Sequence, residues 1–544
     1  MNLEFARERV GGSKLVRDYL DGTGAAPDLF RGRPDDPESY RQKAREVDER
    51  FDQEARRRAV ELVSVPEEAD ASRLERLVEE GGYFVTTGQQ PGLFSGPIYS
   101  IYKALSAVGR ARALQELLDR PVVPLFWVAS EDHDWEEVAR TVVADVDNNL
   151  REIVVSSPMK DEEPPLHRIV LEKELEEARL RLESVLPDTD FSSRYEELLR
   201  RAYAPGTTLP TAFQTVLEEL LGPFGLCFVQ AHEEGLKEAS LPVLFRELEQ
   251  AGEHEDILRE RADALEAAGY HVQVPILENG VNLFLEGSEG RERLYRVGPG
   301  EDAPDDATDE ASREVYRLHR SGAEVTRDEI QARVEKDPRV LTPNALLRPV
   351  VESTVFPTLS YVAGPGETAY FAQLSGLFER HGVGMPVVAP RCSMTVVEAK
   401  NRKVLDKFDL EISQLDRPFH ELASEVARDE VPGEVRRALG SFRGAVSEHA
   451  RKLLDAATDI DPTLKGPIEN ARSTAALALD DVEKKIVQAV KRQDEIALNQ
   501  LEKVQVHLFP EGRPQERVMN VFYYLVRYGE DFLGAVAEEC KVEL

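Results

Sequence analysis

The chain has 544 residues, of which 68 are basic and 102 acidic, so its formal net charge is −34. A chain this acidic repels nucleic-acid phosphates and anionic lipid, which excludes a general nucleic-acid-binding protein. Hydrophobic residues make up 41% of the sequence, enough for a large folded core, and this excludes wholesale disorder.

Cysteine usage and the N-terminus indicate the compartment. Cys227, Cys392 and Cys540 lie far apart and form no CxxC pair, so we expect neither a disulfide framework nor a cysteine-rich zinc site. The N-terminus has acidic residues and no apolar signal-peptide core. The longest strongly apolar stretch, 121–129, is too short to span a bilayer. We therefore expect a cytoplasmic protein with no membrane partner.

Two short apolar runs predict the start of a parallel sheet. Residues 83–87 are a β-prone run that we expect to end at Gly88–Gly92, and residues 122–129 are a second buried-strand run. Between them, Pro97 fits the first turn of a helix that continues to about Leu118. A strand, a helix and a strand in this order form a βαβ unit, so the predicted fold class is α/β with a parallel sheet.

The rest of the first 400 residues contains further strands and inserted segments. Residues 1 to about 80 have a helical pattern, strongest at 40–65, and 224–230 and 385–391 have the pattern of core strands. We also expect several less regular segments: a helical insertion at 155–215 with a helix near 172–186, a β-hairpin at 272–284 that turns near Asn279-Gly280, an exposed loop at 297–313, and a polar stretch at 342–370 followed by a helix to about Arg380.

From about residue 400 the pattern becomes that of a coiled coil. One helix carries residues at heptad spacing, with a histidine in one core position: Val435, Leu439, Phe442, Val446, His449 and Leu453. Asp459–Pro462 breaks this pattern, and a second helix continues it with Leu479, Val482, Ile486 and Ala489. We predict an antiparallel coiled-coil hairpin that ends near 508–512, followed by an aromatic segment at 521–524 that docks on the core.

The first polar cluster directly follows the strand at 83–87. It contains Gly88, Gln89, Gln90 and Gly96 and leads into the helix that begins with Pro97. Backbone N–H groups at such a helix start bind phosphate or carboxylate groups, and Lys103, two turns into the helix, can add positive charge. The alternative is a tight strand–helix turn whose glycines serve packing alone.

The second polar cluster, Glu131-Asp132-His133-Asp134, follows the strand at 122–129. Three carboxylates around one imidazole can act as general base, metal ligands or an ammonium-binding site. The alternative is a helix N-cap, in which Asp132 or Asp134 caps the following helix. Both functions are compatible, because a capping aspartate and a site histidine can share one turn.

Arg348 lies in an apolar segment and needs an anionic partner, because a buried unpaired charge is costly. Its partner is either Glu352 or a substrate carboxylate or phosphate. Residues 361–370 repeat the earlier pattern of an apolar run, a glycine turn and a helix with an acid, Glu367, in its first turn. Glu367 either binds a ligand or caps that helix.

Arg391 and Ser393 follow the strand at 385–391. Ligands of parallel sheets bind at the carboxyl ends of the strands, where all of these polar clusters fall. We therefore expect both residues to reach the same crevice as the clusters at 88–92 and 130–134.

With these residues in view, the chain resembles the bacillithiol biosynthesis cysteine-adding enzyme family, the cysteine ligases of the last bacillithiol step. The resemblance covers essentially the whole chain and is carried by five stretches: Thr87–Tyr99 (TGQQPGLFSGPIY), Phe126–Asp134 (FWVASEDHD), Leu347–Pro349 (LRP), Gly364–Tyr370 (GPGETAY) and Leu508–Arg517 (LFPEGRPQER).

The resemblance implies a Rossmann-like core related to class I nucleotidyltransferases, with inserted connecting segments, and a C-terminal antiparallel coiled coil that supports a homodimer. We expect three parts: a catalytic core at 1–400 with insertions at about 155–215 and 235–330, a coiled-coil hairpin at 401–507, and a C-terminal segment at 508–544 that docks back on the core.

The resemblance further implies that L-cysteine is joined to glucosaminyl-malate to give bacillithiol, a low-molecular-weight thiol. It implies ATP-dependent amide formation with Mg²⁺. The expected route is attack by the carboxylate of cysteine on the α-phosphorus, followed by attack of the sugar amine on the adenylate, and the alternative is activation as an acyl phosphate. Zinc is not expected, because three scattered cysteines and one site histidine would make an unusual ligand set.

The residues expected to carry this chemistry fall in two groups. Asp132, His133 and Asp134 are the catalytic candidates, which would position the cysteine ammonium or move protons. The candidates for binding the nucleotide and other substrates are Gly88, Gln89, Gln90, Gly96, Tyr99, Lys103, Glu131, Arg348, Gly364, Glu367, Tyr370, Arg391 and Ser393.

The chain departs from the family pattern at two positions. Val351 stands before Glu352 where relatives usually have Gln, and Tyr102 stands before Lys103 where relatives often have His. A histidine at that place therefore has no role in this chain.

Two other classes of function remain open on the residues alone. One is a metal-dependent hydrolase that uses Glu131–Asp134 and needs no ATP. The other is a non-catalytic ligand-binding protein whose coiled coil is its main working surface.

Overall fold

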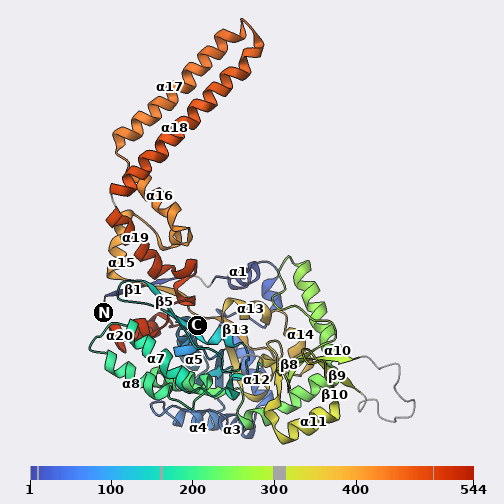
Figure 1. Ribbon diagram of the computed structural model, residues 1–544. Coiled ribbons are helices and arrows are strands. Elements are labelled where there is room, and N and C mark those ends of the chain that lie inside the picture. Colours follow the sequence, from blue (N-terminus) through green and yellow to red (C-terminus); the bar gives the residue numbers. More distant parts are fainter. Residues whose placement is uncertain (1, 9–10, 160–162, 298–313, 494) are drawn as a thin grey trace. The chain divides into compact units, whose positions relative to one another are not determined.

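The computed structural model describes residues 2–8, 11–159, 163–297, 314–493 and 495–544 (Figure 1). This part of the chain divides into two compact units. Unit 1 comprises residues 5–395 and 516–544, and unit 2 comprises residues 2–4 and 396–515. The loop expected at 297–313 lies, apart from its first residue, outside the described residues.

A five-stranded parallel sheet forms the centre of unit 1. Its strands, in spatial order, are β13 (Val387–Pro390), β12 (Thr358–Ala363), β2 (Tyr83–Gln89), β3 (Val122–Val128) and β6 (Cys227–Gln230). Every neighbouring pair is parallel. This sheet confirms the predicted α/β fold class, whereas the relation to class I nucleotidyltransferases stays a prediction.

Side chains alternate between the two faces of this sheet, as the period of a β-strand requires. On one face, Tyr83 and Val85 pack with residues of α2 (Pro37–Arg50) and α5 (Tyr99–Leu118). On the other face, Phe84 belongs to the larger core that includes α10 (Glu234–Ala267). Both faces are therefore covered, which explains why the strands read as continuous apolar runs.

A second, antiparallel sheet is inserted in unit 1. Its strands, in spatial order, are β10 (Glu324–Thr326), β9 (Val315–Leu318), β8 (Gly290–Val297), β7 (Gly280–Gly287) and β11 (Leu341–Pro343). The hairpin predicted at 272–284 is wrong. A turn does close at Asn279-Gly280, where Gly280 N donates to Leu277 O, but it precedes β7, and β7 pairs with β8.

The N-terminal helices differ in detail from the prediction. The region 40–65 contains two helices, α2 and α3 (Gln53–Val60), because Phe51 is extended and Asp52 caps α3. The described segments before β2 also contain β1 (Leu3–Arg7), α1 (Lys14–Asp21) and α4 (Ser72–Glu79).

The insertion between β3 and β6 consists of a short hairpin and helices: α6 (Trp135–Val138), β4 (Arg140–Ala144), β5 (Leu150–Val154), α7 (Lys173–Val185), α8 (Ser192–Ala202) and α9 (Leu209–Leu221). The remaining elements of unit 1 are α11 (Arg327–Lys336), α12 (Arg348–Val355), α13 (Pro365–Phe371), α14 (Ser375–Arg380), α20 (Phe522–Tyr528) and α21 (Asp531–Glu539), and β14 (Met394–Glu398) lies at its boundary.

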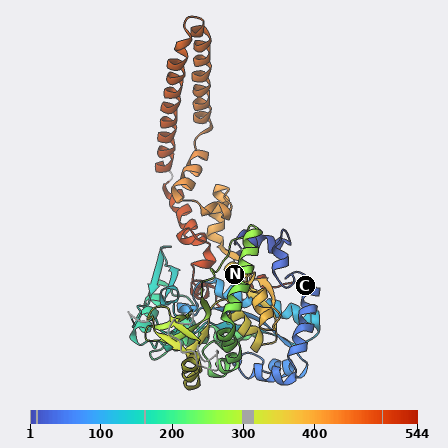
Figure 2. The ribbon, with the colours of Figure 1, turned by 90° about the vertical axis from the view of Figure 1, so that its right-hand side faces the viewer.

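Unit 2 is helical and contains α15 (Ala399–Phe408), α16 (Phe419–Asp429), α17 (Gly433–Thr458), α18 (Lys465–Gln493) and α19 (Glu495–Leu508). Helices α17 and α18 pack against each other as a long antiparallel pair (Figure 2). This pair confirms the predicted C-terminal coiled coil. No helix in the described ranges combines the length and apolarity needed to cross a bilayer.

The predicted heptad seam is only partly correct. Val435, Leu439 and Val446 are half-buried and Leu479 is buried, but Phe442 is 59% exposed. His449, Leu453 and Val482 are exposed as well. The reason is that half-buried positions 450 and 454 continue the contact between the two helices, so the packed stripe rotates away from the predicted one.

Candidate active site

A cavity of about 460 Å³ lies at the carboxyl ends of β2, β3, β12 and β13. Its wall contains the end of β2, the first turns of α5, α12 and α13, and the residue that follows β13. This is the edge at which parallel sheets bind their ligands. All of these segments belong to unit 1.

The loop between β2 and α5 is held in an unusual backbone conformation. Phe94, Ser95 and Gly96 have φ angles of 52°, 70° and 66°, a region that residues with a Cβ rarely adopt. Asn520, fully buried, donates from Nδ2 to Phe94 O at 2.8 Å and to Gly96 O at 3.1 Å. The segment at 516–544 therefore fixes the loop that forms one side of the cavity.

Strand β2 continues two residues further than predicted. Gly88 and Gln89 pair with Trp127 and Val128, so the glycine does not end the strand. A Cβ on Gly88 would lie 3.0 Å from the carbonyl oxygen of Trp127, tighter than most Cβ contacts, so β3 would have to shift slightly. Glycine at this position thus lets β2 and β3 run side by side up to the cavity.

Lys103 forms the buried positive centre of one wall. Its side chain is 2% exposed, forms an ion pair with Glu367, and donates from Nζ to Gly88 O at 2.5 Å. Burial lowers the pKa of Lys103. Burial disfavours ionisation of Glu367 as well, but Lys103 and the hydrogen bonds from Tyr361 Oη and Gly364 N hold its pKa below the usual value. Glu367 therefore both caps α13 and faces the cavity.

Arg348 provides a second cation of the wall, and Tyr361 links it to Glu367, the partner of Lys103. It donates from Nη1 to Glu352 Oε2 at 2.8 Å and from Nη2 to Tyr361 Oη at 3.1 Å. Glu352 is buried and also accepts a hydrogen bond from Thr86. The structural partner expected for Arg348 is thus present, and the guanidinium still lines the cavity.

Arg391 is the third cation and is almost fully buried. Its guanidinium binds both oxygens of Glu516, at 2.9 and 2.5 Å. Ser393 donates from Oγ to Glu516 Oε2 at 3.0 Å and does not line the cavity. Arg517, next in the chain to Glu516, lines the cavity with an exposed side chain.

The cluster at 131–134 lies beside the cavity and reaches it through Gln90. The Nε2 of Gln90 donates to Asp132 Oδ2 at 2.7 Å and to Glu137 Oε2 at 2.9 Å, and both Gln90 and Glu137 line the cavity. Asp134 accepts from Glu137 N and caps α6, as the helix-cap alternative predicted. Glu131 is buried in an ion pair with Lys237 at 2.5 Å.

His133 packs against Arg291 and Phe284 of the inserted sheet. The Nη1 of Arg291 lies 3.2 Å from His133 Nδ1, and the rings of His133 and Phe284 are 5.7 Å apart. Burial and the charge of Arg291 lower the pKa of His133, so the ring is neutral near pH 7. It has the protonation state of a base, although it does not line the cavity.

The structure brings most of the predicted residues to one cavity. Those that line it are Gly88, Gln89, Gln90, Tyr99, Lys103, Arg348, Gly364, Glu367, Tyr370 and Arg391. The predicted residues that do not line it are Gly96, Glu131, Asp132, His133, Asp134 and Ser393. The three catalytic candidates are in this second group, with Asp132 one hydrogen bond away through Gln90.

Sequence reasoning missed several lining residues: Trp127, Ala129, Glu137, Ala345, Tyr361, Pro365, Gly366 and Arg517. Some carried a signal, because Trp127 and Ala129 lie inside the stretch 126–134 and Arg517 ends the stretch 508–517. Glu137 had none, since an acid in the first turn of a helix normally only interacts with the helix dipole.

The wall of the cavity favours an anionic ligand that also has a flat apolar part. Four cations, Lys103, Arg348, Arg391 and Arg517, line the cavity with two carboxylates, Glu137 and Glu367. Glu352 and Glu516, which pair with Arg348 and Arg391, do not line it. Aromatic rings from β3, α5, β12 and α13 complete it. Arginine groups bind phosphates and carboxylates in a bidentate manner, and rings bind planar groups by stacking.

Two family models match the chain and together cover nearly all of it. The description "Bacillithiol biosynthesis BshC, N-terminal Rossmann-like domain" matches residues 1–392. The description "Bacillithiol biosynthesis BshC, C-terminal coiled-coil domain" matches residues 394–542.

Curated relatives agree with the family models. A protein of Salinibacter ruber is 32% identical over 477 residues, which is 88% of this chain and 84% of the relative. One of Chlorobaculum tepidum is 32% identical over 87% of this chain and 83% of its own length. One of Solibacter usitatus is 28% identical over 98% of this chain and 96% of its own length. All three bear the name "Putative cysteine ligase BshC".

Proposed function

Because this chain belongs to the bacillithiol biosynthesis BshC family, we propose that it is a cysteine ligase that joins the carboxyl group of L-cysteine to the amine of glucosaminyl-malate, with ATP as the activating substrate. The observation that supports this most is the cation-rich cavity at the carboxyl ends of the parallel strands. Both ATP and a malate group carry negative charges that such a wall attracts.

In this proposal the phosphates lie near the loop at 88–96 and the start of α5. Lys103 and Arg348 neutralise the phosphate charge, and Arg517 adds an exposed cation. The aromatic wall takes the flat adenine or the apolar face of the sugar. Glu137 is the lining carboxylate that is free of a lysine ion pair, so it is the residue that would hold a Mg²⁺ ion brought by ATP.

Cysteine is expected to bind between Arg348 and the carboxylates at the start of α6. Asp132 and Glu137, joined by Gln90, attract its ammonium group. Its carboxylate oxygen attacks the α-phosphorus of ATP and pyrophosphate leaves, giving cysteinyl adenylate. The sugar amine then attacks the acyl carbon, AMP leaves, and a base takes the amine proton. Asp132 or the neutral His133, through water, is the candidate base.

The test is a mass-spectrometric assay of purified protein with cysteine and glucosaminyl-malate, with and without ATP and Mg²⁺. We expect bacillithiol only when ATP is present, together with AMP. Release of ADP would replace the adenylate with an acyl phosphate and keep the ligase. Absence of product with every addition would refute the proposal.

A pair of arginine variants tests whether this cavity is the site. We expect Arg348→Met to lower kcat/KM by roughly 100-fold or more, because a preorganised cation is lost from the reacting groups. The matched control is Arg76→Met, since Arg76 is exposed and forms its ion pair with its helical neighbour Glu80. Equal turnover of the two variants would move the reaction away from the cavity.

The hydrolase alternative is disfavoured by the contacts of the cluster at 131–134. Glu131 is committed to Lys237, and Asp134 caps α6, so two of the three carboxylates already have structural partners. A hydrolase would turn over without ATP and would lose activity with a chelator, which the assay above also detects.

We further propose that a second copy of the chain packs on the coiled coil. Phe442 and Leu453 of α17 are 59% and 57% exposed, and Leu477 of α18 is 66% exposed. Phe442 and Leu453 are about three helical turns apart and therefore share one side of α17. Burial of these side chains would stabilise a homodimer.

Light scattering after size-exclusion chromatography tests this homodimer. We expect twice the mass of the chain for the unmodified protein and for the control Glu448→Ser, which changes an exposed polar residue of α17. We expect the mass of one chain for Phe442→Ser/Leu453→Ser. A dimer that survives the double substitution would exclude this surface.

A further inference from the structure

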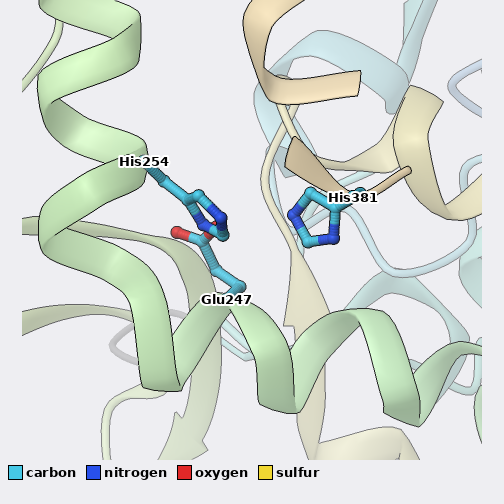
Figure 3. A group of neighbouring side chains, drawn as sticks. All are labelled: Glu247, His254 and His381. Atoms are coloured by element: carbon cyan, nitrogen blue, oxygen red, sulfur yellow. The ribbon is translucent and has the colours of Figure 1, made fainter. Parts of the chain in front are cut away.

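A buried cluster of two histidines and one glutamate lies in the interior of unit 1. Glu247 and His254 come from α10, and His381 directly follows α14 (Figure 3). One ligand atom from each side chain lies within 4.8 Å of the other two. None of the three lines the cavity described above.

The backbone of α10 brings its two members together. Gln250, which lies between them, has non-helical φ and ψ angles of −119° and 18°. The helix bends there, so that Glu247 and His254 approach from its two arms (Figure 3). The Nδ1 of His254 lies 2.6 Å from Glu247 Oε2.

The hydrogen bonds of Glu247 show that its carboxylate is held in place. Its Oε1 accepts two hydrogen bonds from Asn282, from the backbone N and from Nδ2, each at 2.9 Å. Its Oε2 then faces His254. The anchored Oε1 fixes the direction of Oε2, which lies among the possible ligand atoms of the two histidines.

The two histidines leave three buried nitrogens without a hydrogen-bond partner: His254 Nε2, His381 Nδ1 and His381 Nε2. His254 is fully buried, and His381 is 5% exposed. Their rings lie 4.8 Å apart at an angle of 39°. Buried polar atoms nearly always have a partner, so packing alone leaves this cluster unexplained.

We propose that Glu247, His254 and His381 bind one Zn²⁺ ion, each supplying one ligand, with a fourth position for water. Imidazole and carboxylate ligands in this two-to-one ratio suit zinc rather than Mg²⁺ or Ca²⁺, which prefer oxygen ligands. A bound ion gives a partner to one of the His381 nitrogens that lack one and offsets the buried carboxylate charge.

The ion would join α10 to the segment after α14. Helices α10 and α14 already contact each other, and α13, just before α14, carries Glu367 and Tyr370 in the cavity wall. The expected role is therefore structural: zinc fixes the segment on which these two residues stand. This site is separate from the ligase proposal and does not depend on it.

The experiment uses untagged full-length protein. Metal is removed with a chelator, and Zn²⁺ is titrated into the metal-free protein in competition with a chromophoric zinc chelator. We expect one Zn²⁺ per chain, and in parallel a visible absorption spectrum of four-coordinate Co²⁺ when Co²⁺ replaces it. Zn²⁺ should also raise the Tm of the metal-free protein.

The variants assign the ligands. We expect His381→Ala to lose at least about 100-fold in Zn²⁺ affinity and Glu247→Gln about 10- to 100-fold. His420→Ala, at an exposed histidine of α16, is the matched control and should bind as the unmodified protein does. Circular dichroism checks that each variant is folded. If His381→Ala does not fold, the Zn²⁺ affinity of Glu247→Gln, a substitution that preserves the shape of the side chain, decides whether the site exists.

Two results would overturn the proposal. One is that the unmodified protein takes up no Zn²⁺ in competition with a chelator of micromolar affinity. The other is that Glu247→Gln and His381→Ala bind Zn²⁺ with the stoichiometry and affinity of the unmodified protein, which would place any bound ion elsewhere.

Discussion

Replacing Lys103 with methionine is expected to destabilise unit 1 in a manner that depends on pH. The substitution keeps the length of the side chain but removes the charge that neutralises Glu367. Breaking a buried ion pair by removing one partner costs about 3–5 kcal/mol. Glu367 keeps its hydrogen bonds from Tyr361 Oη and Gly364 N, so we expect the lower end, about 3 kcal/mol at pH 8.

The pH dependence follows from the state of Glu367. In the unmodified protein its pKa is lowered, so the pair contributes stability above the unfolded pKa and loses it as the pH falls through the folded pKa. Without Lys103, burial dominates and raises the folded pKa above the unfolded one. The carboxylate then takes up a proton as the pH falls, and the cost of the substitution should shrink by about 1–2 kcal/mol between pH 8 and pH 5.

Urea unfolding monitored by tryptophan fluorescence measures this effect in the relevant unit, because both tryptophans, Trp127 and Trp135, lie in unit 1. Lys43→Met is the matched control: Lys43 is also buried, and burial lowers its pKa to about 8. The carboxylate of Glu46 lies 3.9 Å from it and is partly exposed. The cost of Lys43→Met should differ by less than about 0.5 kcal/mol between the two pH values. A Lys103→Met cost that is equal at pH 5 and pH 8 would refute the reasoning.

Three further predictions concern other parts of unit 1. Burial lowers the pKa of His167 to about 3 and that of His232 to about 4, so both rings resist protonation in the folded protein. Their contribution to the free energy of unfolding should be complete above about pH 6.5 and should fall by about 2 kcal/mol for the pair at pH 5, after allowance for partial exposure. Urea unfolding of His167→Gln/His232→Gln should therefore depend less on pH than that of the unmodified protein. Asn520→Ala removes the donor to the carbonyls of Phe94 and Gly96 and should cost about 2–4 kcal/mol in urea unfolding. A change below about 0.5 kcal/mol would show that the loop does not need this side chain. Glu516→Gln leaves Arg391 with an uncharged partner, so its positive charge is more available to an anion. Calorimetry should show tighter pyrophosphate binding, and urea unfolding should show a lower free energy of unfolding. Weaker pyrophosphate binding would contradict an electrostatic role for Arg391.

Local patterns were sufficient to predict the parallel sheet and the position of the cavity at its edge. The runs at 83–87 and 122–129 are short, apolar and followed by polar turns, and the geometry of parallel strands forces such turns to one edge. This is why Gln90, Arg348 and Glu367 could be assigned to one crevice although they are distant in the sequence.

What the sequence does not reveal are pairings that only tertiary packing decides. Arg391 and Glu516 are 125 residues apart and nothing near either of them indicates the other. Asn279-Gly280 has the composition of a hairpin turn, which led us to expect a strand on each side of it. The strand that follows the turn, β7, pairs instead with β8, which comes later in the chain. Phe442 follows the heptad spacing and is still exposed, because small drifts between 3.5 and 3.6 residues per turn rotate the seam.

The catalytic candidates show the same limit. Glu131 to Asp134 form the densest polar cluster, yet three of the four residues carry structural contacts, with Lys237, Arg291 and the backbone of α6. The cluster of Glu247, His254 and His381 had no sequence signal, because a bend at Gln250 and a segment more than 100 residues away assemble it.

The measurement that tests the central claim most directly is the ATP-dependent formation of bacillithiol by the purified chain and by Arg348→Met, followed by mass spectrometry with cysteine labelled with ¹⁸O in its carboxyl group. We expect the unmodified protein to form bacillithiol and to transfer one ¹⁸O atom to AMP. Arg348→Met should show neither result, and Arg76→Met should show both. Full product formation by Arg348→Met, or product without ATP, would contradict the central claim.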